Sequence, residues 1–156
     1  MYPVSTFIVG AQKCGTTALY TFLNEHPDIQ FGCQKELHVF DNEQIDWFQS
    51  IDSVCDQYFD VDSTVDCKVD ATPIYMYWPS AMQRLHSYNS KAKILVLLRD
   101  PIERAYSHWV MESNRGSEDV SFADAIRHGR NRFDKVHRVY SYVERGFYAS
   151  QLERIY

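Results

Sequence analysis

The sequence has no long apolar run and no recognisable export signal. Its longest purely aliphatic stretch, Ile94–Leu98, is far shorter than the roughly 20 apolar residues that a membrane-spanning helix needs. Residues 1–6 lack both the basic and the apolar region of a signal peptide. We therefore expect no transmembrane segment in this sequence, and the sequence alone favours a cytoplasmic location.

Cysteines are also scarce. The four of them are too few to scaffold 156 residues, and none stands in a CxxC pair: Cys14, Cys33, Cys55 and Cys67. This pattern disfavours a metal site. Reduced thiols are the simpler interpretation without an export signal, and a single disulfide remains the alternative.

Basic residues are rare in the first half of the chain. Residues 1–78 carry three basic and twelve acidic side chains, a net charge of −9, whereas residues 79–156 carry a net charge of +4. A general nucleic-acid-binding surface is therefore not expected, while an anion can be attracted to the second half.

Strands alternate with helices along the chain. The patterns predict strands at 6–9, 65–70 and 93–98, helices at 16–26, 80–88, from 100, from 121 and at 150–156, and short helices at 45–48 and 54–59. Leu19, Phe22 and Leu23 are expected on one face of the first helix. Asp100, followed by Pro101 in the first turn, is expected as the N-cap of the helix that begins there. The continuously apolar strand 93–98 is expected at the centre of the sheet.

This alternation predicts one α/β domain over residues 1–156, with a central parallel sheet flanked by helices in three layers. Ligands of such sheets bind beyond the carboxyl ends of the strands, which directs attention to the residues after Val9, Asp70 and Leu98.

A glycine loop follows the first strand. Residues 10–17, GAQKCGTT, have the GxxxxG spacing of a phosphate-binding loop that opens a helix. A simple strand-to-helix turn is the alternative. A Walker A loop places lysine directly after the second glycine, whereas that place holds Thr16 here and the lysine is Lys13. The difference disfavours a site for a nucleoside triphosphate and magnesium.

A loop lysine followed by two threonines resembles the 5′-phosphosulfate loop of sulfotransferases, which use 3′-phosphoadenosine 5′-phosphosulfate (PAPS) as donor. The segment 99–107, RDPIERAYS, resembles that family's 3′-phosphate block. The resemblance implies that Arg99 and Ser107 bind one phosphate, with the arginine as a forked donor. Without the resemblance, Arg99 is a strand-end ion-pair partner and Ser107 a polar helix residue.

Three further segments resemble the same family. Residues 35–41, KELHVFD, are similar to a motif of its heparan-sulfate-type branch, which implies Glu36 as the catalytic base with His38 beside it. A solvated loop carboxylate is the alternative interpretation of Glu36. Residues 70–75 resemble a stretch in which some members carry a lysine, replaced here by Ala71. Lys68 points to the opposite face of that strand. Residues 146–152 resemble the block that opens a late helix.

The resemblance implies a P-loop-like fold and sulfuryl transfer from PAPS to a hydroxyl or amine of a glycan or small alcohol, by in-line displacement. The product is adenosine 3′,5′-bisphosphate, and no metal is required because Lys13 supplies the cation. The implied donor-binding residues are Gly10, Gln12, Lys13, Cys14, Gly15, Thr16, Thr17, Arg99 and Ser107; the implied catalytic residues are Glu36, Lys13 and His38.

Two alternatives stay open: a P-loop kinase or hydrolase with Asp70 as its Walker B aspartate, and a non-catalytic nucleotide-binding fragment. Family members continue into another strand and a loop that covers the donor, so this chain is expected to lack both. A location in the Golgi lumen would require an N-terminal anchor that has been removed. The acidic first half favours an acceptor of low charge over a long polyanion.

Overall fold

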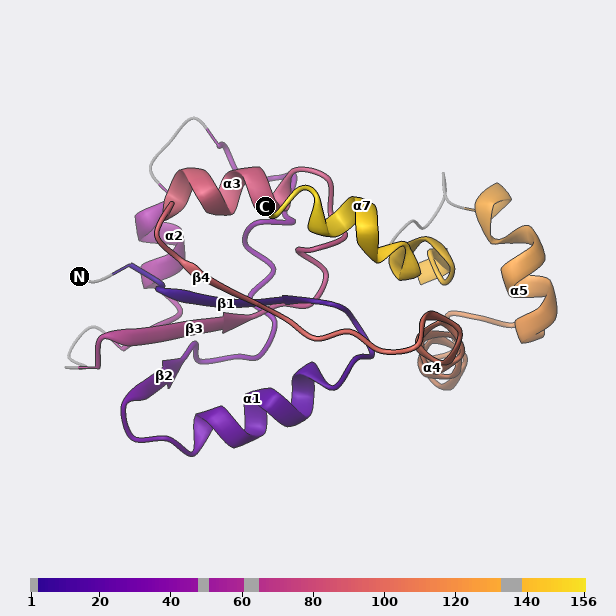
Figure 1. Ribbon diagram of the computed structural model, residues 1–156, viewed down its shortest axis with the longest axis horizontal. Helices are drawn as coiled ribbons and strands as arrows, with labels where there is room; N and C mark the ends of the chain where they lie inside the picture. Colours follow the sequence, from indigo (N-terminus) through magenta and orange to yellow (C-terminus); the bar gives the residue numbers. More distant parts are fainter. Residues whose placement is uncertain (1–2, 48–50, 61–64, 133–138) are drawn as a thin grey trace.

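The computed structural model describes residues 3–47, 51–60, 65–132 and 139–156. Its centre is a parallel sheet with helices against both faces, which confirms the predicted fold class (Figure 1). The strands lie in the order β2-β3-β1-β4 and every neighbouring pair is parallel. Their bounds are β1 (Thr6–Gly10), β2 (Ile29–Phe31), β3 (Cys67–Ala71) and β4 (Lys93–Val96).

β1 is an inner strand of this sheet, between β3 and β4, and all five of its residues are buried. The prediction that the strand at 93–98 is central is wrong, because β4 lies at the edge of the described sheet and ends at Val96. Its apolar run fits packing against helices, since Ile94 and Val96 are partly buried against the core, but Leu95 is 37% exposed. An apolar run indicates that both faces of a strand are covered, but it does not indicate whether one or two other strands pair with it.

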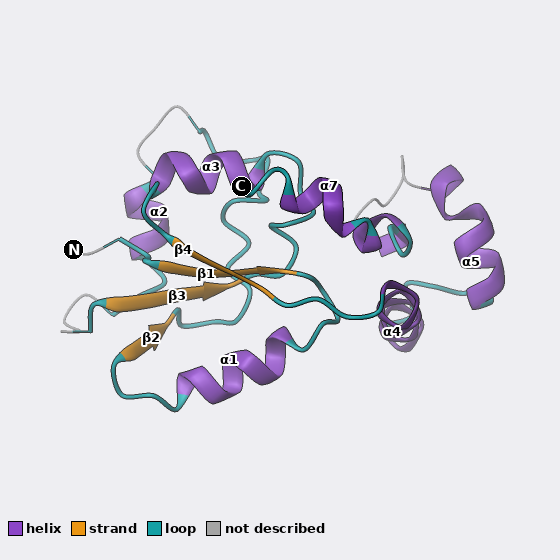
Figure 2. Ribbon diagram, viewed as in Figure 1, coloured by secondary structure: helices purple, strands orange, loops and turns teal. Residues whose placement is uncertain are grey.

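One face of the sheet is covered by α1 (Thr16–Asn24), as Figure 2 shows. Leu19, Tyr20 and Leu23 pack against the strand residues of this face. Phe22 was expected beside them but is 72% exposed, because it lies one position off that stripe. Thus α1 begins at Thr16 as predicted, but the face that packs on the sheet does not include Phe22.

The opposite face is covered by α2 (Asp52–Asp56), α3 (Ala81–Tyr88) and α7 (Tyr148–Leu152) (Figure 1). Phe7 and Val9 of β1 point into this larger core. α2 overlaps the predicted helix at 54–59, whereas 45–47 form no helix and residue 48 lies outside the described residues. The last helix starts two residues earlier than predicted and ends at Leu152.

Beyond the carboxyl end of β4 lie α4 (Pro101–Asn114) and α5 (Phe122–His128) (Figure 1). Asp100 caps α4 as predicted, since its side chain accepts hydrogen bonds from the N–H groups of Ile102 and Glu103. Ser121 caps α5 in the same way. Two 3₁₀ turns complete this part, η1 (Gly129–Arg132) and η2 (Glu144–Gly146).

All four cysteines lie in described segments, where none is bonded to another cysteine. Lys68 and Ala71 belong to opposite faces of β3, as predicted: the Lys68 ammonium lies over the Phe59 ring, and Ala71 packs on the α1 side. Within the described residues, no helix has the length and apolarity needed to cross a membrane.

Candidate active site at the carboxyl ends of the strands

The loops that leave β1, β2 and β3 meet at one edge of the sheet, because all strands run the same way. Residues from all three loops line a cavity of about 600 Å³. The site is therefore where the topology of a parallel sheet predicts a ligand. Its lining is Gln12, Lys13, Gly15, Thr16, Thr17, Lys35, Glu36, His38, Pro73, Ile74, Met111, Glu112, Arg115, Val139 and Arg145.

The loop after β1 turns sharply into α1. Gly15 has a φ of 89° and Lys13 a φ of 70°, so both occupy the left-handed region. No side chain in the described part of the chain caps the N-terminus of α1, which leaves its first N–H groups for a ligand. Burial lowers the pKa of Lys13, with a further contribution from the nearby Arg115 guanidinium.

The loop after β2 presents Glu36 and His38. Both residues have positive φ, 61° and 54°, and with Lys13 they are the non-glycine residues of the described chain in that region. Such backbone conformations cost on the order of 1 to 3 kcal/mol each and gather at functional sites. The three residues in question are also the three predicted catalytic residues.

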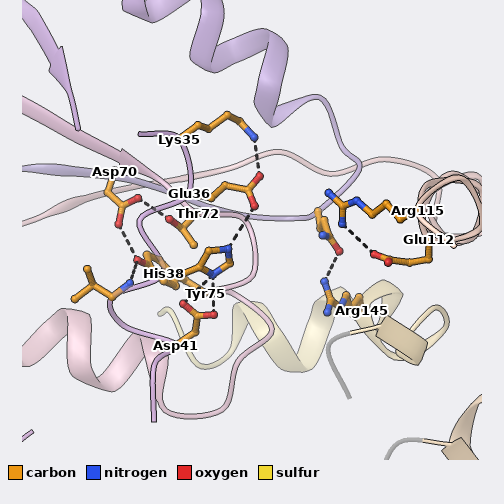
Figure 3. A network of polar contacts seen from close by, with 12 residues as sticks. Lys35, Glu36, His38, Asp41, Asp70, Thr72, Tyr75, Glu112, Arg115 and Arg145 are labelled. Carbon is orange, nitrogen blue, oxygen red and sulfur yellow. Dashed lines mark hydrogen bonds and ion pairs between the residues drawn. The ribbon is translucent and has the colours of Figure 1, made fainter. Parts of the chain in front are cut away.

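Cations surround the Glu36 carboxylate (Figure 3). His38 Nε2 lies 3.6 Å from Glu36 Oε2, and Lys35 Nζ lies 2.6 Å from Glu36 Oε1. These two partners, His38 first, lower the pKa of Glu36 to about 2 against the opposing effect of burial. Glu36 is therefore ionised throughout the physiological pH range.

His38 is in turn held by Asp41, whose side chain is fully buried. His38 Nδ1 lies 2.9 Å from Asp41 Oδ2, and this contact, together with Glu36, raises the pKa of His38 to about 9. The result is a line of alternating charges, Asp41, His38 and Glu36, that ends in the cavity. It resembles the general arrangement in which a buried carboxylate orients an imidazole.

A buried network behind the site fixes this loop (Figure 3). The Val39 N–H donates to the Tyr75 hydroxyl, which donates to Asp70 Oδ2 over 2.8 Å; Thr72 Oγ1 donates to Asp70 Oδ1 over 2.6 Å. Burial raises the pKa of Asp70 to about 6. Because Asp70 is buried and does not line the cavity, it is poorly placed for a Walker B role.

Four charged lining residues were not predicted as site residues: Lys35 beside Glu36, Glu112 and Arg115 at the end of α4, and Arg145 in η2. Arg115 Nη1 lies 3.3 Å from Glu112 Oε1. Arg145 is buried, donates through Nε to Ser141 Oγ over 2.8 Å, and donates to the Gln12 side chain. Asp41 was also missed as an orienting residue, although it stands in the quoted motif three positions after His38.

Arg99 and Ser107 are brought together, but they line a different hollow, at the start of α4. Arg99 Nη2 makes an exposed ion pair with Glu103 Oε2 at 2.8 Å. The predicted donor-binding residues are therefore distributed over two cavities. Gly10 and Cys14 are buried behind the first of them.

Main-chain hydrogen bonds connect the two places. The Leu97 N–H donates to the Gly10 carbonyl and the Ala11 N–H donates to the Leu97 carbonyl, each over 2.8 Å. The segment that carries Arg99 therefore runs beside the loop that carries Lys13, and the two cavities belong to neighbouring strand ends.

A parallel α/β fold in which the first strand runs through a glycine loop into a helix is the P-loop-like class of domain, and here the loop and the ionised Glu36 line one cavity. Residues 3–155 match the sulfotransferase domain family, and the chain belongs to that family.

Relatives and a solved structure agree with this membership. The chain is 32% identical over 152 residues to heparan sulfate glucosamine 3-O-sulfotransferase 6 of Homo sapiens, covering 94% of this chain and 41% of that protein. It is 32% identical over 164 residues to the human bifunctional heparan sulfate N-deacetylase/N-sulfotransferase 3, covering 94% and 18%. A sulfotransferase crystal structure from Alicyclobacillus acidocaldarius superposes with a TM-score of 0.87 at 28% identity, over 99% of this chain and 68% of that one. The chain thus spans less than half the length of these two curated relatives.

Proposed function

We propose that this domain transfers a sulfuryl group from PAPS to a hydroxyl or amine of a glycan. One observation carries the proposal: the phosphate loop with Lys13 and the ionised carboxylate of Glu36 face the same cavity. In-line transfer needs a cation at the leaving group and a base at the acceptor. Membership of the family supports the reaction, and two relatives named for heparan sulfate support a glycan acceptor.

The residues fit a donor that carries phosphates at both ends. Lys13 and the uncapped start of α1 suit the 5′-phosphate, where negative charge grows as the donor is cleaved. Arg99 and Ser107 suit the 3′-phosphate, since a guanidinium and a hydroxyl can donate to the same anion. When bound, the donor supplies the activated sulfuryl group.

Glu36 accepts the proton of the acceptor. The acceptor oxygen or nitrogen forms a bond to sulfur as the bond from sulfur to the 5′-phosphate oxygen breaks, and that phosphate leaves with the electron pair. Lys13 neutralises the departing phosphate. His38 and Lys35 keep Glu36 ionised and fixed in direction, because each holds one of its two oxygens.

The charge of the cavity differs from that of the first half of the chain. Five cationic side chains line it, Lys13, Lys35, Arg115, Arg145 and the protonated His38, against the two carboxylates of Glu36 and Glu112. The charge that an acceptor meets at the cavity is therefore positive. An anionic glycan is compatible with the site despite the net charge of −9 over residues 1–78.

The test separates binding from transfer in the purified protein. Glu36→Gln should bind adenosine 3′,5′-bisphosphate as wild type does in calorimetry and lose transfer from PAPS by at least about a hundredfold. Glu25→Gln, an exposed change at the end of α1, is the control and should keep both properties. Full transfer by Glu36→Gln, or equal binding of ATP with magnesium, would contradict the proposal.

A further inference from the structure

Tyr148 contacts one residue from each predicted half of the donor site. Its hydroxyl donates to the Arg99 carbonyl over 3.0 Å and lies 3.6 Å from Cys14 Sγ. Cys14 belongs to the phosphate loop, and Arg99 to the segment between β4 and α4. The phenol donates its single proton to the Arg99 carbonyl, and its contact with Cys14 places it against the phosphate loop.

We infer that Tyr148 is a positioning residue that sets the place of Arg99 relative to the phosphate loop, so that one nucleotide can engage both. The inference rests on the proposed function. It gives Tyr148 a role in recognising the 3′-phosphate, although its hydroxyl lines neither cavity.

The need for such a contact follows from where the strand pairing ends. The last main-chain hydrogen bonds between the loop and the β4 segment involve Leu97. Arg99 lies two residues further on, and its guanidinium is 42% exposed and paired with the exposed Glu103. Among the hydrogen bonds of the described residues, the one from the Tyr148 hydroxyl holds the main chain at Arg99.

The contact acts on the side chain through the backbone. Fixing the Arg99 carbonyl fixes the peptide plane that leads into Asp100, the N-cap of α4, whose side chain is itself held by two N–H groups. The direction of the Arg99 side chain and the start of the helix that carries Ser107 are then set together. Forked hydrogen bonding to a phosphate depends on this direction.

The Tyr148 hydroxyl remains a hydrogen-bond donor at physiological pH. Tyr148 is half-buried, and burial raises its pKa to about 12, with Cys14 contributing. The hydroxyl therefore keeps its proton throughout the physiological pH range and remains a donor to the Arg99 carbonyl. Because the acceptor is the main-chain carbonyl of Arg99, a substitution of the Arg99 side chain leaves this hydrogen bond in place.

Calorimetry with Tyr148→Phe tests the inference, because the variant keeps the ring and removes the hydroxyl. Adenosine 3′,5′-bisphosphate should bind about three- to tenfold more weakly, the effect of one hydrogen bond, whereas adenosine 5′-phosphate should bind within twofold of wild type. When Tyr148→Phe is combined with Arg99→Ala, it should change the affinity for adenosine 3′,5′-bisphosphate less than twofold relative to Arg99→Ala alone. Tyr156→Phe, at a 93% exposed tyrosine, is the matched control and should change neither affinity.

Other results would overturn the inference. If Tyr148→Phe weakens both nucleotides equally, Tyr148 supports only the phosphate loop; if it weakens neither, the contact has no role in binding. If Arg99→Ala itself leaves bisphosphate binding unchanged, the donor site of the proposed function fails as well. Loss from Arg99→Ala without loss from Tyr148→Phe rejects the inference alone.

Discussion

Replacing Asp41 by asparagine tests how the site keeps Glu36 ionised and in place. Asp41 is fully buried. Its hydrogen bond to His38 is the largest of the effects that raise the pKa of His38 from an ordinary value of 6.5 to about 9. Asp41→Asn removes that charge, so the pKa of His38 should fall toward 6.5. The protonated fraction of the imidazole at and above neutral pH would then fall, and Glu36 would lose part of its principal cationic partner's charge.

The sign of the stability effect follows from the direction of the shift. Because the folded state raises the pKa of His38, the stabilisation is complete below pH 6.5 and is lost as pH rises through about 9. The His38 side chain is 44% exposed, so solvent screening reduces the stabilisation to about 1 kcal/mol. Wild type should lose about 1 kcal/mol more than Asp41→Asn between pH 6 and pH 10.

Two measurements check this prediction. An NMR titration should place the wild-type His38 ring near pH 9 and the Asp41→Asn ring at least about one unit lower, with His38→Gln identifying the resonance. Urea unfolding at both pH values gives the difference in free energy. Asp28→Asn, at an exposed aspartate, is the control. An unchanged His38 titration in Asp41→Asn would refute the reasoning.

Three further changes have defined outcomes. Glu103→Gln should strengthen binding of adenosine 3′,5′-bisphosphate about twofold in calorimetry, because an exposed carboxylate no longer competes for Arg99; weaker binding would contradict the assignment. Gly15→Ala and Gly116→Ala should each lower the free energy of unfolding by about 1 kcal/mol, since both glycines have positive φ. Gly15→Ala should also weaken nucleotide binding, whereas Gly116→Ala should not. Equal nucleotide affinities of the two variants would argue against a phosphate at the loop that carries Gly15. Phe22→Ser should change the free energy of unfolding in urea by less than about 0.5 kcal/mol, and a loss above 2 kcal/mol would place Phe22 in the core.

The parts of the fold that local rules determine were predictable from the sequence. The run from β1 through the glycine loop into α1 follows from a β-branched segment, a turn and an amphipathic helix. Asp100 was predicted as an N-cap because Pro101 follows it, and the structure confirms the cap. The placement of functional loops at the carboxyl ends of strands followed from the parallel topology.

Features that depend on tertiary neighbours were not predictable in the same way. The edge position of β4 depends on which strands pair, and composition does not encode pairing. β2 has three residues, too few for a periodicity. Arg145 reaches Gln12 from 133 positions away along the chain. Lys35 and Asp41 reach Glu36 and His38 in a loop where these two residues adopt left-handed backbone angles. Such a loop has no regular residue spacing from which the contacts could be predicted.

The central claim is that one nucleotide is held at one end by the loop of Lys13 and at the other by Arg99 and Ser107. Its most direct test is calorimetry of adenosine 3′,5′-bisphosphate with wild type, Lys13→Ala and Arg99→Ala. Wild type should bind one nucleotide per chain, and each variant should bind it about tenfold or more weakly. Two nucleotides per chain, or a loss of affinity in only one of the variants, would contradict it.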